Sequence, residues 1–155
     1  MNRMKDYKFR VWNIKEKRFI HSDYFAIGLS GEIIQHQICY DENDEKGYYD
    51  DSWNEELDVN NYIIQQFTGF LDKEDREIYE GDIVNYTICN LFCGKITYRG
   101  VITWDLTDLS YKIFTYTDYK KYENNIIDKT FNISYNNIIE VVGNIYQNKE
   151  LLENK

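Results

Sequence analysis

The segment Gln66–Val84, QFTGFLDKEDREIYEGDIV, decides the fold of this chain. It continues a strand-like run, Tyr62–Phe67, crosses a charged stretch and reaches the tight turn Glu80–Gly81–Asp82. The run Ile83–Ile88 leaves that turn as another strand. Glycine reaches left-handed backbone conformations without steric strain, so we expect Gly81 to form the corner of the turn.

The residues around this turn admit a structural and a chemical interpretation. In the structural one, Gly69 and Gly81 serve turns, and four apolar residues are core: Ile78, Tyr79, Ile83 and Val84. In the chemical one, Glu80 and Asp82 share one face of a strand, because they lie two residues apart, and paired carboxylates can do acid–base work. We favour the structural interpretation, in which Asp82 hydrogen-bonds the backbone of the turn.

Outward from this segment, the chain reads as many short strands and little helix. Period-two alternation and glycine turns predict strands at Tyr7–Trp12, Arg18–Ile20, Phe25–Leu29, Glu32–His36, Lys95–Thr103, Tyr111–Tyr116 and Ile138–Tyr146. Gly100 predicts a bulge in its strand, and Gly143 predicts a kink. The pattern indicates a mainly β protein, α+β at most, built as a small barrel or sandwich.

Two short helices are also predicted. Ser52 and Glu55 have the spacing of a helix capping box, which favours a short helix before Tyr62. Asn148 is a good N-cap for a short helix that runs through Leu152, and Glu150 suits the positive end of that helix.

Composition narrows the class of protein. The 155 residues suit one domain, and 43% hydrophobic residues are enough for a core. No apolar run reaches the roughly 20 residues of a membrane span, and no signal peptide opens the chain. Three cysteines, an odd number, then favour reduced thiols in a cytosol: Cys39, Cys89 and Cys93. Cys89 and Cys93 are four residues apart, but the two histidines, His21 and His36, lie far from them in the sequence. We therefore expect no metal site. No cofactor is expected either.

Charge is concentrated in one segment, Asp41–Asp58, which carries nine acids and one base and therefore a charge of −8, whereas the whole chain carries −9. One interpretation is a solvated loop that repulsion keeps extended. The other is a docking surface for a basic partner, with candidate residues Tyr48, Tyr49, Asp50, Asp51, Trp53, Glu55 and Glu56. An EF-hand calcium loop is disfavoured, because Lys46 and Ser52 stand where glycine and glutamate are required.

Four segments together resemble the YopX family of bacteriophage and prophage proteins. The most specific is Gln66–Val84, which is similar to the family pattern Q-Y-T-G-L-x-D-K-x-G-x-x-I-Y-E-G-D-I-V. Phe9–Asn13 is similar to the pattern F-R-A-W-D, and Gly100–Asp105 is a weaker match on its own. The fourth match is Ile139–Asn148, followed by Glu150–Leu152. The resemblance covers most of the chain outside the acidic segment and Lys120–Ser134.

Two positions depart from the family pattern. Asp75 replaces a turn glycine, and aspartate tolerates a left-handed backbone better than most residues. Lys149 replaces a proline that is helpful but dispensable at a first helical position. The resemblance implies a small SH3-like barrel with a packed N-terminal β region. It implies a single domain, 1–155, with subdomains at 1–65 and 66–148, and no catalytic residues.

The sequence lacks the motifs G-x-S-x-G, H-E-x-x-H and the Walker loop, so we expect no enzyme. The first hypothesis is a phage or prophage accessory protein that binds another protein in the cytoplasm of a bacterial host. The second is an acidic DNA mimic that blocks a nucleic-acid-binding host protein. A third is homo-oligomeric assembly through pairing of barrel edges. The net negative charge argues against direct binding of nucleic acid, and no membrane partner is expected.

Overall fold

The structure, a computed structural model, describes residues 7–20, 25–28, 33–37, 52–56, 59–90, 94–115, 130–133 and 138–153. Most of their regular structure is β-strand, so the predicted mainly β class is confirmed. The chain forms two compact units: an N-terminal unit, Phe9–Ile64, and a C-terminal unit, Gln65–Lys155 with Met1–Lys8.

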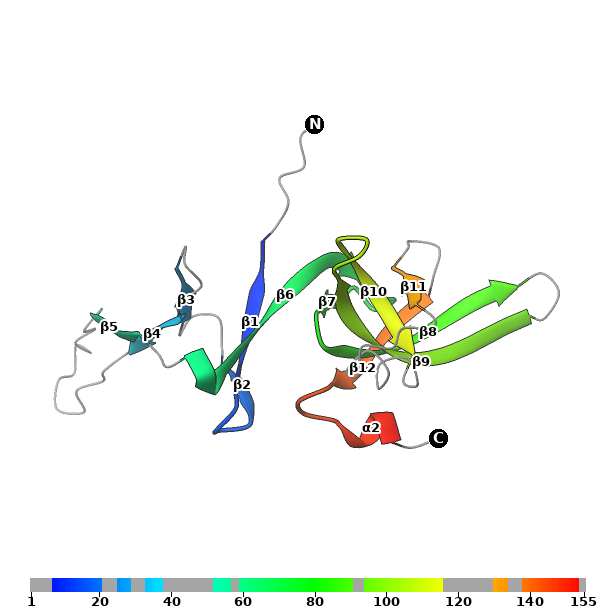
Figure 1. Cartoon of the computed structure of the whole chain (residues 1–155). Coiled ribbons are helices and arrows are strands. Elements are labelled where there is room, and N and C mark those ends of the chain that lie inside the picture. The colour runs from blue at the N-terminus through cyan, green and yellow to red at the C-terminus, as the bar shows by residue number, and fades with distance from the viewer. Residues whose placement is uncertain are drawn as a thin grey trace. The chain divides into compact units, whose positions relative to one another are not determined.

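The N-terminal unit contains a hairpin and a small sheet. The hairpin pairs β1 (Phe9–Asn13) with β2 (Arg18–Ile20), as Figure 1 shows. Val11 is fully buried, and the Trp12 and Phe19 rings pack edge to face with centroids 5.0 Å apart. The sheet has the order β3-β4-β5, formed by β3 (Phe25–Ile27), β4 (Ile33–Gln37) and β5 (Ser52–Glu56). The antiparallel pairing of β3 with β4 confirms the second predicted hairpin.

The capping box predicted at Ser52 is wrong. Ser52 begins strand β5 and pairs with Gln37, while Trp53 pairs with His36. Pairing with a neighbouring strand overrides the local capping signal, since an aromatic residue such as Trp53 is well suited to a sheet. The helix expected before Tyr62 is a single 3₁₀ turn, η2 (Val59–Asn61).

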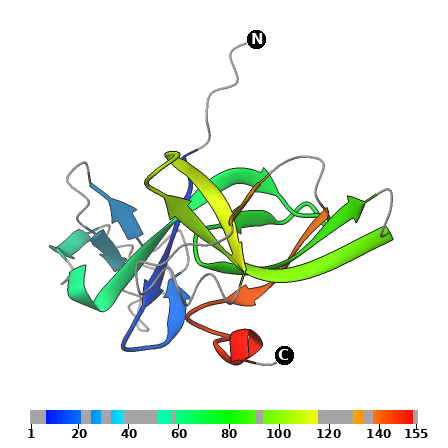
Figure 2. The same ribbon diagram turned by 45° about the vertical axis from the view of Figure 1, so that its right-hand side comes forward.

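The C-terminal unit is dominated by one antiparallel sheet. Strand β6 (Tyr62–Leu71) leads into it from the N-terminal unit and pairs with β7 (Glu77–Tyr79). The sheet itself has the order β11-β10-β9-β8-β12 and curls strongly (Figure 2). Its strands are β8 (Asp82–Asn90), β9 (Gly94–Asp105), β10 (Ser110–Thr115), β11 (Thr130–Asn132) and β12 (Ile138–Asn144), and helix α2 (Glu150–Glu153) follows. The SH3-like barrel that the resemblance implies stays a prediction.

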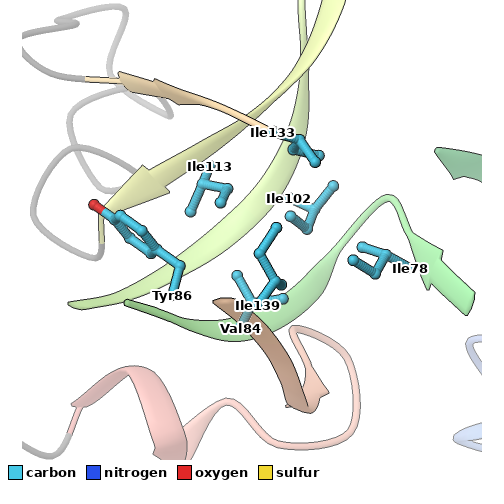
Figure 3. Packing of buried hydrophobic residues seen from close by; sticks show 7 residues of the cluster. All are labelled: Ile78, Val84, Tyr86, Ile102, Ile113, Ile133 and Ile139. Carbon is cyan, nitrogen blue, oxygen red and sulfur yellow. The ribbon is translucent and has the colours of Figure 1, made fainter. Parts of the chain in front are cut away.

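The core of this unit lies on the inner side of the curled sheet, as Figure 3 shows. Its buried residues are Ile78, Val84, Tyr86, Ile102, Ile113, Ile133 and Ile139. Ile83 belongs to a second cluster with Val101 and Leu152. The core predictions for Ile78, Ile83 and Val84 are therefore confirmed. Tyr79 is only half-buried, and its hydroxyl donates a hydrogen bond to Glu77 Oε2 at 2.6 Å.

The glycines of the sheet act in two ways. Gly100 does not form the predicted bulge: it pairs with Val84 and Thr115 in unbroken register. A Cβ at Gly100 would lie 2.6 Å from both Ile113 Cγ2 and the Phe114 backbone oxygen, so glycine is needed there for close packing. The kink predicted at Gly143 is confirmed, because the register of β12 on β8 shifts between Val141 and Gly143.

Candidate functional site

The Glu80–Gly81 turn is held by three backbone hydrogen bonds to segments far apart in sequence. Glu80 N donates to Gln66 O at 3.0 Å, Gly81 N donates to Ile102 O at 2.8 Å, and Ile145 N donates to Gly81 O at 3.0 Å. Gly81 has a φ of 77°, which confirms the left-handed corner expected of it. The turn therefore brings β6, β9 and the segment after β12 together around Glu80.

Asp82 fixes this turn from inside. It is 1% exposed; its Oδ2 accepts the Tyr79 N–H at 2.8 Å, and its Oδ1 accepts the Asn144 side-chain amide at 3.3 Å. The same amide reaches Gln65 Oε1 at 3.2 Å. The predicted role of Asp82 in hydrogen bonding the turn backbone is confirmed, and its carboxylate is committed to the interior of the fold.

Glu80 lies instead among aromatic side chains. It is half-buried, and its carboxylate accepts the Trp104 backbone N–H. Burial raises the pKa of Glu80. Burial, with the charge of Glu80, also raises the pKa of Tyr111 to about 12 and raises that of Tyr146. The Trp104 and Tyr111 rings meet at 71° with centroids 4.9 Å apart. We call Glu80, Trp104, Tyr111 and Tyr146 the Glu80 corner.

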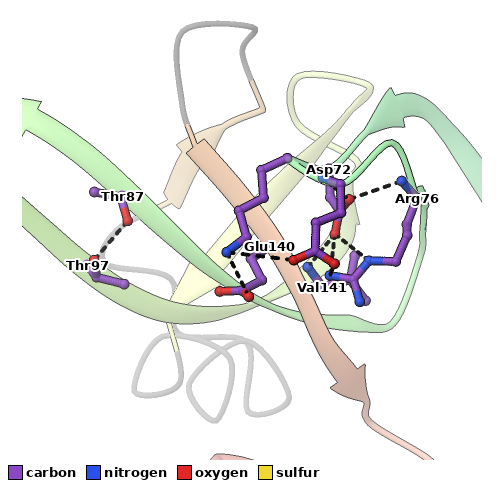
Figure 4. A network of polar contacts seen from close by, with 8 residues as sticks. Asp72, Arg76, Thr87, Thr97, Glu140 and Val141 are labelled. Carbon is purple, nitrogen blue, oxygen red and sulfur yellow. Dashed lines mark hydrogen bonds and ion pairs between the residues drawn. The ribbon is translucent and has the colours of Figure 1, made fainter.

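A second polar site is built on Asp72 and is shown in Figure 4. Its Oδ1 accepts the backbone N–H groups of Glu74 and Arg76 at 2.8 and 3.0 Å, and its Oδ2 accepts Arg76 Nε at 2.9 Å and the Val141 N–H at 3.0 Å. Burial alone would raise the pKa of Asp72, but these hydrogen bonds outweigh it and lower the pKa to about 2. Every partner is part of the fold, so this site is structural.

A buried lysine, Lys112, stabilises the turn between β9 and β10. Lys112 is 7% exposed; its Nζ lies 2.7 Å from Asp105 Oδ2 and also bonds Asp108 Oδ2. Asp105 Oδ1 accepts the Thr107 N–H at 2.7 Å. Hydrogen bonds to Asp105 and Asp108 raise the pKa of Lys112, and the bond from Lys112 lowers the pKa of Asp105. These contacts hold the turn in one conformation.

This turn, which we call the leucine turn, exposes two leucine side chains to solvent. Leu106 is 75% exposed and Leu109 is 67% exposed. Leu109 also has a φ of 51°, in the left-handed region that leucine rarely adopts. Sequence reasoning did not single out either residue. The signal was present, because a turn normally takes glycine, asparagine, aspartate or serine at such positions.

The partner-binding residues that the sequence suggested are not placed by the structure. Tyr48, Tyr49, Asp50 and Asp51 lie outside the described residues. Strand β5 carries the rest, Trp53, Glu55 and Glu56, but their side chains also lie outside the described part. Their role stays a prediction. Among the residues that the structure describes, no group of three or more His, Cys, Asp or Glu could hold a metal ion, and no helix could cross a membrane.

Comparison with known proteins places this fold. The crystal structure of protein EF1440 from Enterococcus faecalis is similar, with a TM-score of 0.54 and 24% sequence identity, covering 96% of this chain and 99% of that one. This likeness shows the fold alone. No curated protein matches the chain. The family model described as YopX protein matches residues 8–153, nearly the whole sequence. The chain therefore belongs to the YopX family.

Proposed function

We propose that this chain is a non-enzymatic accessory protein of a phage or prophage that binds another protein in the cytoplasm of its bacterial host. The observation that carries the proposal is the pair of exposed leucines on the braced β9–β10 turn. Membership of the YopX family supports the phage or prophage context, and the absence of common catalytic sequence motifs supports a binding role.

Stability alone gives no reason for leucines at these two positions. Leu109 occupies left-handed backbone, which costs a residue with a Cβ about 1–2 kcal/mol. Both side chains remain in water, so neither recovers that cost by burial. Departures from local rules are expected where function requires them. A stiff turn that presents two apolar side chains can bind with little loss of conformational freedom.

Replacing Leu109 with asparagine should raise the free energy of unfolding by about 1 kcal/mol, because asparagine tolerates this backbone better. The same variant, and Leu106→Ser, should each weaken partner binding. Thermal melts measure the first effect. Capture by the tagged protein from host lysate, followed by titration of the captured protein, measures the second.

Leu71→Ser is the matched control, because Leu71 is also exposed, at 51%, but lies in β6 and not on the turn. It should bind as the wild type does. A loss of stability in Leu109→Asn would mean that the leucine stabilises the fold. Turnover on a panel of hydrolase and nuclease substrates, lost in Glu80→Gln, would contradict the non-enzymatic role.

A DNA mimic is the alternative, and the charge of −8 on Asp41–Asp58 favours it. If this segment is the working surface, partner affinity should fall steeply with salt, because exposed charges are screened beyond about 10 Å at 0.1 M. Amide substitutions at Asp50, Asp51, Glu55 and Glu56 should mainly slow association. Duplex DNA should compete for the partner. Affinity that ignores both salt and these substitutions would contradict the alternative.

A further inference from the structure

The Glu80 corner brings one carboxylate together with three aromatic side chains. Trp104 and Tyr111 are direct cross-strand partners on β9 and β10. Tyr146 comes next to the turn because the preceding residue, Ile145, bonds Gly81 O. The Trp104 backbone N–H bonds the Glu80 carboxylate. Four side chains from four separate segments therefore converge on one half-buried patch.

Among the residues that the structure describes, none gives the Glu80 carboxylate a cationic partner. By contrast, Glu77 pairs with Lys8, and Glu140 pairs with Lys73. A half-buried carboxylate is costly without such a partner. A cation supplied from outside would offset this cost.

The chemistry of the side chains in the Glu80 corner favours one kind of cation. The faces of tryptophan and tyrosine rings attract ammonium and guanidinium groups, most strongly where water is partly excluded. Ca²⁺ and Mg²⁺ need six or more oxygen ligands, which one carboxylate among aromatic rings does not provide. We propose that the Glu80 corner binds the cationic side chain of a lysine or arginine on the partner protein.

This inference rests on the proposed protein binding, and the two sites are close along the strands. The pair Trp104–Tyr111 is followed by Asp105–Ser110, and the leucine turn comes immediately after that pair. A partner segment that carries an apolar side chain near a lysine or arginine can therefore engage both sites. The expected partner surface is basic and apolar.

The test uses small cations as probes, so that it does not depend on finding the partner. The full-length protein is titrated with n-butylammonium, methylguanidinium or neutral n-butanol at matched ionic strength. The indole N–H signal of Trp104, assigned with Trp104→Phe, is followed by NMR. Both cations should shift this signal saturably, and n-butanol should not. Glu80→Gln should lower the affinity for both cations at least about tenfold. The tighter cation indicates lysine or arginine as the ligand.

Glu74→Gln is the matched control, since it removes the same charge from an exposed side chain and should leave the affinity unchanged. Tyr146→Leu removes an aromatic ring but keeps an apolar side chain. It should lower the affinity for the cations even though Glu80 is unchanged. Equal shifts with n-butanol and the cations, or full affinity in both Glu80→Gln and Tyr146→Leu, would overturn the inference. If the cations do not bind but the leucine variants lose the partner, only this inference fails. If the cations bind but the Leu106 and Leu109 variants still bind the partner, only the proposed binding role of the leucine turn is contradicted.

Discussion

Replacing Gly81 with valine should lower the free energy of unfolding by about 3 kcal/mol or more. A β-branched residue is strained at a φ of 77°. A Cβ at this position would also lie 2.2 Å from Gln65 Nε2. Gln65 is 2% exposed and bonded to Asn144, so it cannot move aside without breaking a buried hydrogen bond. Denaturant titration of the purified variant measures the loss.

Gly69→Val separates the two causes of this loss. Gly69 has a φ of 88°, but no heavy atom lies within 4 Å of a Cβ built there. It should therefore lose only the backbone contribution, about 1–2 kcal/mol. Equal losses at the two glycines would show that the contact with Gln65 is unimportant. Equal midpoints for Gly81→Val and wild type would show that the turn does not need glycine.

Replacing Asp72 with alanine should cost about 3 kcal/mol, because it removes the acceptor of three backbone N–H groups and of the Arg76 guanidinium. The loss should lie at the low end for a broken buried ion pair, because the Arg76 side chain is 47% exposed and solvent weakens its attraction to Asp72. Glu74→Ala, at an exposed neighbour, should change stability by less than about 0.5 kcal/mol. Similar losses in the two variants would contradict a structural role for Asp72.

The same carboxylate makes stability depend on pH. Its pKa is about 2 in the folded protein, against an ordinary value of 3.8, so the unfolded chain takes up the proton first as pH falls. The contribution of Asp72 is fully present above about pH 4 and is lost as the pH falls toward 2. Unfolding curves between pH 5 and pH 2 should show a smaller loss in Asp72→Ala than in the wild type. Parallel curves would contradict this linkage.

Local chemistry was enough to predict the fold around the Glu80 turn. The positive φ of Gly81, the tolerance of Asp75 for a φ of 62° and the inward bonds of Asp82 all follow from residue types in a short stretch. The capping box at Ser52 and the bulge at Gly100 failed because contacts with distant strands decided those positions. Such contacts leave no local signature in a single sequence.

Sequence reasoning singled out neither candidate site as a binding site, because both depend on contacts between residues that are apart in the sequence. The Glu80 corner depends on the register that sets Trp104 opposite Tyr111 and on the backbone bond that brings Ile145 to Gly81. The leucine turn depends on Lys112 bridging two aspartates across a hairpin. The sequence predicted the strand Tyr111–Tyr116, but it gave no indication of which aromatic rings meet.

The position of β12 beside β8 has a consequence for the growing chain on the ribosome. Strand β8 ends at Asn90, but its neighbour β12 begins only at Ile138. The Val141 N–H that donates to Asp72 is also synthesised late. Until those late residues are synthesised, one edge of β8 has no strand to pair with. An exposed edge is a template for pairing with other chains. A premature stop codon before Ile138 should therefore give an aggregating product that requires chaperones, even though most of the sheet has already been translated.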